Sequence, residues 1–223
     1  MRTATSRLRP HTPAAPSAPT RRDRRKLATR QALLDATHSL LASRSLDALS
    51  VDEIAMRADV AKGTFYNYFP DKEALARELA SHMRMRLDNE IARTNAGIDD
   101  PVQRIARAFC CVLRLCLSAP EQAAAMLALF PRAIDPAAPI NAGVRHDVAY
   151  GLAQGRIVAP SADVAIACIV GVVMAGANRA LDLSAEQTRA FAQDLGALLL
   201  HGLGLSRMQA ARIMREAVES ILA

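Results

Sequence analysis

Residues 50–72, SVDEIAMRADVAKGTFYNYFPDK, constrain the fold of this chain more than any other stretch. Ser50 and Glu53 have the spacing of a capping box, which satisfies free N–H groups at the start of a helix. The next apolar residues recur at i, i+3, i+4 and i+7, so this helix has one buried face: Val51, Ile54, Ala55 and Ala58. Asp59 stands at the turn that follows, and a second helix is expected from about residue 61 to residue 69. The stretch therefore predicts two short helices joined by a tight turn.

The second helix has an apolar side and a polar side. Phe65 and Phe69 are four residues apart, so they share a face and can pack inward together. The other face carries an amine, hydroxyl groups and a glycine, which suit base edges, phosphates and a closely approaching duplex. A helix-turn-helix places such a helix in the major groove. The residues expected to contact DNA are Ser50, Lys62, Gly63, Thr64, Tyr66, Asn67, Tyr68 and Lys72.

Residues 54–75, IAMRADVAKGTFYNYFPDKEAL, resemble the TetR family of bacterial transcriptional regulators. The pattern of that family runs roughly I-A-x-x-A-G-V-S-x-G-T-hydrophobic-Y-x-Y-F-x-x-K-E-x-L. Two positions differ, because Asp59 replaces the usual turn glycine and Ala61 replaces the serine that usually starts the recognition helix. We expect a slightly strained or reshaped turn from the first change, and the loss of a helix cap and a phosphate contact from the second. Spacing alone, without the resemblance, also fits a helical hairpin inside an ordinary bundle.

Basic residues are concentrated near the start of the chain. Residues 1–30 contain nine Lys or Arg and one acid, whereas the net charge of the whole chain is only +6. Residues 1–20 contain four prolines and no apolar run of a secretory signal, so we expect a flexible arm on a cytoplasmic protein. The arm and residues 21–26, RRDRRK, can lie along phosphates or reach the minor groove. A solvated tail is the alternative.

The remaining pattern is helical, with no alternating strand pattern. We expect an all-α protein with an arm (1–20), a three-helix DNA-binding domain (21–71) and a helical body (72–223) for effector binding and dimerisation. A helix expected to begin at residue 72 is long enough to link the DNA-binding domain to the body.

Residues 164–177, VAIACIVGVVMAGA, form the most apolar segment of the chain. Fourteen residues are too few to span a membrane, so this helix belongs in a core or an interface. The resemblance assigns it and the helix at 185–203 to a four-helix bundle between two subunits. The alternative is that the two helices bury each other within one monomer. The expected interface residues are Ile169, Val173, Phe191, Leu195, Leu198 and Leu199.

The resemblance also implies that the body encloses an effector cavity. Pockets are mainly apolar with a few placed polar groups, and methionines adapt to varied ligand shapes, so a small hydrophobic effector is expected. The alternative for each candidate residue is that it packs in the hydrophobic core and contacts no ligand. The candidates are Phe109, Leu113, Cys116, Met126, Phe130 and Met174, with Arg145 and His146 as polar groups.

Motifs for catalysis and metal binding are not found in the sequence. The four cysteines, at 110, 111, 116 and 168, form no C-x-x-C pair and have no histidine at metal-ligand spacing. They are expected to be buried apolar residues; a redox sensor would need a low thiol pKa and access to solvent. We therefore expect no catalytic residue, no metal and no cofactor.

These features predict a dimeric regulator, a repressor by the family's usual sign, that binds a palindromic operator and is released by an effector. The partners are double-stranded DNA, a small molecule and a second copy, with no membrane. Two alternatives remain open. One is a helical small-molecule-binding protein or enzyme with a vestigial DNA-binding head, and the other is a non-specific DNA binder that uses the basic arm alone.

Overall fold

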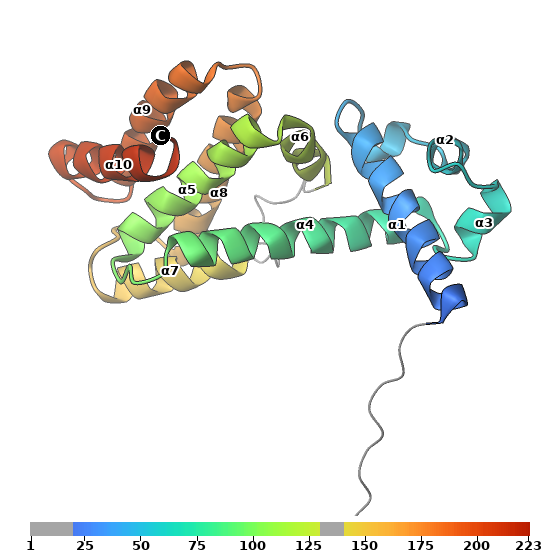
Figure 1. Ribbon diagram of the computed structural model, residues 1–223. Coiled ribbons are helices and arrows are strands. Elements are labelled where there is room, and N and C mark those ends of the chain that lie inside the picture. The colour runs from blue at the N-terminus through green and yellow to red at the C-terminus, as the bar shows by residue number, and fades with distance from the viewer. Residues whose placement is uncertain (1–19, 130–140) are drawn as a thin grey trace, which may run out of the picture.

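The computed structural model describes residues 20–129 and 141–223, and within these ranges the chain is helical without any strand. The all-α prediction is therefore confirmed. Figure 1 shows a small head at one side and a larger body at the other, with one long helix running between them. The expected arm, apart from Thr20, and Phe130 lie outside the described residues.

The head contains α1 (Arg21–Leu41), the short 3-10 helix η1 (Leu46–Ala48), α2 (Val51–Arg57) and α3 (Lys62–Tyr66). Thr20 caps α1 and Ser50 caps α2, each in a capping box with the acid three residues later. α3 is shorter than expected, because after Tyr66 the backbone tightens and the Asn67 N–H donates to the Thr64 carbonyl at 3.2 Å. The two-helix prediction thus holds, with a different end for the second helix.

The turn between α2 and α3 has a strained backbone conformation at Asp59, the residue that stands in place of the usual glycine. Asp59 has φ of 55°, in the left-handed region, and among the described residues it is the non-glycine residue with positive φ. Aspartate tolerates this conformation better than most side chains but less well than glycine. The turn is therefore preserved here by a residue that carries a negative charge.

Two phenylalanines anchor α3 from behind. Phe65 is 0% exposed and Phe69 is 2% exposed, with their ring centroids 6.0 Å apart. The guanidinium of Arg30 on α1 lies 4.8 Å from the centre of the Phe69 ring and also pairs with Glu78 of α4. These contacts join Phe69, in the segment that follows α3, to α1 and connect α1 to α4 (Lys72–Thr94).

α4 is the link between head and body (Figure 1). Asp71 caps it through the Ala74 N–H, and 23 residues give it a length of about 35 Å. Leu75 is buried near its start, and Met83 is buried near its middle. One continuous helix therefore joins the head to the body.

The body is built around α5 (Pro101–Ser118), which packs against α4 and against every later helix: α6 (Pro120–Leu129), α7 (Ala142–Ala153), α8 (Ala162–Ala180), α9 (Ala185–Gly202) and α10 (Arg207–Ile221). Asp100 caps α5, with Pro101 at its first position. α6 also packs against α1 of the head, so the head and the body are in contact through these two helices as well as joined by α4.

α8 is longer than the fourteen-residue apolar segment suggests. It has 19 residues and, among the described residues, it is the helix that is long and apolar enough to cross a membrane by length and composition. A core helix of a soluble protein passes the same test. Only 33% of this stretch is buried within the chain. α8 therefore presents apolar surface that its own chain leaves uncovered.

Candidate functional site

The exposed face of α3 gathers most of the residues expected to contact DNA. Lys62, Gly63 and Asn67 are exposed, and Tyr66 keeps 50% of its surface accessible. The Tyr66 ring lies nearly perpendicular to the buried Phe65 ring, with the centroids 5.4 Å apart, so Tyr66 is packed on one side while half of its surface stays exposed. Thr64 and Tyr68 are half-buried. A rigid helix thus presents an amine, an amide and hydroxyl groups to a partner outside the chain.

Gly63 has no structural requirement within its own chain. A Cβ atom added there would meet no other atom within 4 Å. The residue lies in a helix, where glycine is less favourable than alanine by about 1 kcal/mol. A close approach by an external backbone, such as a DNA strand, is a physical reason for a bare helix surface at this position.

Lys62 has a partner that sequence reasoning missed. Its Nζ lies 2.7 Å from Asp52 Oδ2 of α2, and both side chains are more than half exposed. The hydrogen bond to Asp52 raises the pKa of Lys62 above its ordinary value. The amine is therefore fully charged, and a carboxylate on the same surface partly neutralises it.

Ser50 lies at the edge of the same surface, at the start of α2. Its Oγ accepts from the Glu53 N–H at 3.2 Å and donates to Glu53 Oε2 at 2.9 Å. Arg44 lies 2.7 Å from the other oxygen of Glu53. The Arg44 hydrogen bond, together with those from Ser50, lowers the pKa of Glu53 to about 2. The cap is thus held by a charged carboxylate, and Ser50 remains exposed.

Lys72 does not face outward as expected. Its Nζ donates to three backbone carbonyls, those of Leu46 at 3.1 Å, Asp47 at 3.3 Å and Leu49 at 2.9 Å. An ammonium group has three N–H donors, so all of them are used within the chain. Lys72 is therefore a structural brace for η1, and the expected phosphate contact is removed from the site.

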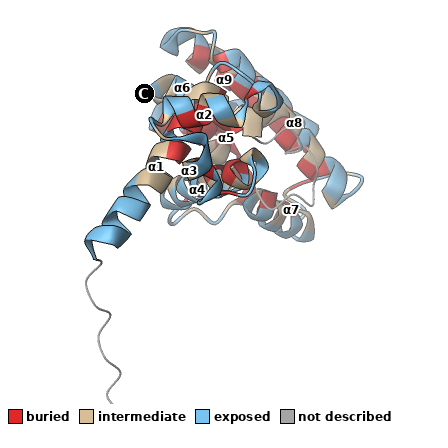
Figure 2. Cartoon of the chain, turned by 90° about the vertical axis from the view of Figure 1, so that its right-hand side faces the viewer, coloured by how far each residue is buried: buried red, intermediate tan, exposed pale blue. Residues whose placement is uncertain are grey.

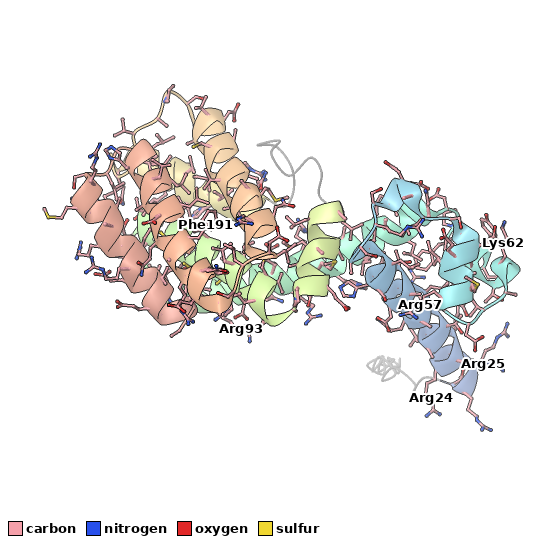
Figure 3. All side chains as sticks on the ribbon, turned by 90° about the horizontal axis from the view of Figure 1, so that it is seen from above. Arg24, Arg25, Arg57, Lys62, Arg93 and Phe191 are labelled. Carbon is pink, nitrogen blue, oxygen red and sulfur yellow. The ribbon has the colours of Figure 1, made fainter. Side chains whose placement is uncertain are left out.

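The basic start of α1 lies at the same end of the molecule as α3. Arg21, Arg22, Arg24, Arg25 and Lys26 are all exposed, and Figure 2 shows these first turns of α1 standing clear of the head. An open groove separates them from α3, with Arg22 and Lys26 on one side and Asn67 on the other. Figure 3 shows Arg24, Arg25 and Lys62 projecting away from the body. Positive charge therefore flanks the exposed face of α3.

A separate cavity of about 250 Å³ lies in the body among α4, α5, α7 and α8. Three of the expected residues, Phe109, Met126 and Met174, line it. Leu113 and Cys116 are buried but do not line this cavity, and the Cys116 thiol donates to the Ala177 carbonyl at 3.6 Å. The cavity walls are mainly aliphatic, as expected for a small apolar ligand.

The polar groups of the cavity differ from those expected. Arg145 is half-buried and His146 is exposed, and neither lines the cavity. Arg104 and Asp147 do, with Arg104 Nε 2.7 Å from Asp147 Oδ1. Asp88 also lines it, and desolvation against the wall raises the pKa of its carboxyl although its outer side is exposed. No sequence signal pairs Arg104 with Asp147, because 43 residues separate them.

The outer surface of α8 and α9 differs in part from the expected interface. Leu198 is 67% exposed, and Phe191 and Leu195 are half-buried (Phe191 is labelled in Figure 3). Ile169 and Leu199, in contrast, are buried within the chain, and Val173 lines the cavity with Ile169. The face of α8 that points outward carries other residues, namely Val164, Cys168, Val172 and Ala175.

The cysteines of α5 are unsuited to a thiolate role. Burial raises the pKa of Cys110 to about 12 and that of Cys116 to about 11, and it also raises the pKa of Cys111. A high pKa disfavours the reactive thiolate. Cys168 is exposed on α8. Across residues 20–129 and 141–223, no group of three or more His, Cys, Asp or Glu is placed to hold a metal ion.

Comparison with known proteins identifies relatives of part of this chain. Residues 33–79 match the family model described as bacterial regulatory proteins, tetR family. An HTH-type transcriptional regulator of Mycobacterium tuberculosis is 30% identical over 92 residues, which cover 41% of this chain and 46% of that protein. The HTH-type transcriptional repressor KstR of the same species is 34% identical over 76 residues, 34% of each chain. The chain thus matches less than half the length of these curated relatives.

A comparison of structures extends the similarity into the body. The crystal structure of RolR in complex with resorcinol aligns with a TM-score of 0.61 at 26% identity, over 86% of this chain and 95% of that one. A TetR-family regulator from Shewanella sp. PV-4 aligns with a TM-score of 0.68 at 19% identity, over 80% of this chain and 99% of that one. The head and the body therefore have the fold of these solved structures.

Proposed function

Because this chain belongs to the TetR family of bacterial regulatory proteins, we propose that it is a ligand-responsive transcriptional regulator that binds operator DNA as a dimer. The observation that carries the proposal is the construction of α3. Phe65 and Phe69 are buried behind the helix, while Lys62, Tyr66 and Asn67 are left open to solvent. A helix fastened in this way can enter the major groove without losing its packing.

Two copies would bind a roughly palindromic operator, with one α3 in each of two successive major grooves. The uncovered apolar surface of α8 and α9, with Leu198 at its most exposed point, supports a dimer in which these helices pair. A twofold axis requires the same patch on both copies. Since such a regulator acts on the chromosome, we place it in the cytoplasm.

The effector is proposed to be a small, mainly apolar molecule that carries hydroxyl donors. The aliphatic walls of the body cavity would bury its apolar part, and the carboxylates of Asp88 and Asp147 are acceptors for its hydroxyls. RolR, the structural relative described above, was solved with resorcinol, which has this chemistry. A thermal shift of the purified protein with resorcinol and with related phenols would test the class.

Release from DNA would result from a movement of α4, because this helix connects the head to the cavity. This helix starts beside the head at Lys72 and lines the cavity at Leu87, Asp88 and Ile91. An effector that binds one position of α4 more tightly than another shifts the equilibrium between head spacings. We propose that the chain represses transcription, as KstR, a transcriptional repressor, does.

The decisive experiment is a mobility-shift titration of the full chain against the DNA upstream of its own gene, with random DNA as competitor. Tyr66→Phe removes the exposed hydroxyl and keeps the ring that packs on Phe65. We expect Tyr66→Phe to weaken binding several-fold and Tyr66→Ala to weaken it further, with the dimer intact. Binding that tolerates both changes would contradict the α3 interface. Binding that random DNA removes completely would indicate a non-specific DNA binder.

A further inference from the structure

A second cleft lies in the body between α4, α5 and α6, and it shares the lining residues Leu87 and Met126 with the apolar cavity. Its volume is about 290 Å³, close to the lower limit of small-molecule pockets. The buried side chains of Met83, Cys111 and Met126 contribute to its wall. The charged groups of this cleft are mainly cationic, whereas the apolar cavity is lined by two carboxylates and one guanidinium.

Three guanidinium groups and one carboxylate line this cleft, those of Arg86, Arg93, Arg114 and Glu90. Arg93 donates to Glu90 Oε2 and Arg114 donates to Glu90 Oε1, so both oxygens of the carboxylate are engaged. Arg86 has no ion pair or hydrogen bond with any residue in the described part of the chain. The cleft therefore carries two positive charges more than its one carboxylate neutralises.

We propose that this cleft binds a small organic carboxylate, with its carboxylate among the arginines and its short apolar tail against Met83 and Met126. A guanidinium has five N–H donors in a planar fork that matches a carboxylate. All N–H donors of Arg86 are available to a ligand, and Arg93 and Arg114 each keep N–H donors that do not bond to Glu90. The apolar wall favours an anion with a hydrocarbon part over an inorganic anion, which has nothing to bury there.

The position of the cleft connects this site with the head. α6 forms one side of the cleft and packs against α1, and α4 forms another side and also packs against α1. A carboxylate that draws Arg86 of α4 and Arg114 of α5 together would hold α4 in one position. The effect on DNA rests on the proposed regulator function, whereas binding at the cleft does not.

The test is calorimetric titration of the full chain, without DNA, with hexanoate, with hexanol and with inorganic phosphate. We expect saturable binding of hexanoate, at least tenfold weaker binding of hexanol, and weaker binding of phosphate. Arg86→Gln should weaken hexanoate binding about tenfold. Arg212→Gln, on the exposed face of α10, is the matched control and should leave the affinity unchanged.

Glu90→Gln distinguishes a binding role of the arginines from a structural one. Removal of the carboxylate frees the donors of Arg93 and Arg114, so hexanoate should bind several-fold more tightly. A purely structural role predicts weaker binding or none. The proposal is overturned if hexanoate does not bind, if hexanol binds equally well, or if Arg86→Gln binds like the wild type. The last result would place hexanoate in the apolar cavity, which Arg86 does not line.

Discussion

Lys62 Nζ of α3 and Asp52 Oδ2 of α2 lie 2.7 Å apart on the exposed face of the head. The pair joins the two helices of the helix-turn-helix at the surface that we propose meets DNA. Both side chains are solvated, so the pair adds little to stability. Its larger effect is on DNA binding, because Asp52 partly neutralises an amine that would otherwise be free for a phosphate or a guanine edge.

Asp52→Asn should therefore raise the affinity for operator DNA several-fold. The change removes a negative charge from the DNA-facing side and releases Lys62. Fluorescence anisotropy at several salt concentrations would measure it, with the largest gain at low salt. Asp182→Asn on the body, where the side chain is 72% exposed, is the control. Equal or weaker binding by Asp52→Asn would mean that the Lys62–Asp52 pair positions α3 for binding.

Lys72→Met should lower stability and leave the salt dependence of DNA binding unchanged. The methionine keeps an apolar stem but leaves the carbonyls of Leu46, Asp47 and Leu49 without their donor. The expected loss is about 1–3 kcal/mol of unfolding free energy, measured by urea denaturation. If Lys72 contacted a phosphate instead, the slope of log K against log salt would fall by about 0.9 for each subunit.

Glu53 should make the head sensitive to acid. Its folded-state pKa of about 2 lies below its ordinary value of 4.5. The stabilisation is therefore fully present above pH 4.5 and is lost as the pH falls toward 2. Wild type should be more stable than Glu53→Gln at pH 7, and the difference should vanish near pH 2 in denaturation experiments. In an Arg44→Gln background the difference should vanish at a higher pH, since Arg44 is the largest cause of the shift. A constant difference across this pH range would exclude the capping carboxylate as its source.

Leu198→Asp should separate the dimer without unfolding the chain. Leu198 is 67% exposed on α9, so a charge there is solvated in the monomer and is buried only when a second copy packs on it. Light scattering would report the mass, and circular dichroism would report the helix content. Leu199→Asp is the contrasting variant: this side chain is 4% exposed, and its substitution should unfold the body. A wild-type chain that is monomeric at all concentrations would refute the α8–α9 interface.

The head was predictable because its signals are local. The capping box at Ser50, the turn at Asp59 and the spacing of Phe65 and Phe69 each act within one or two helical turns. Their structural outcomes follow the sequence, including the positive φ of Asp59. The direction of Lys72 was wrong because its three carbonyl partners depend on how η1 folds back against α4, which no local pattern specifies.

Sequence alone determined that the chain is helical, that it carries a helix-turn-helix with two buried phenylalanines, and that its apolar helices lie toward the C-terminus. Only the tertiary structure decided which faces of those helices are covered. In the folded chain Ile169 is buried and Leu198 is exposed. Arg104 pairs with Asp147, and three arginines line one cleft with Glu90. The physical reason is range: caps and helical periodicity act over a few residues, whereas a cavity or an ion pair between helices depends on how distant segments pack around α5.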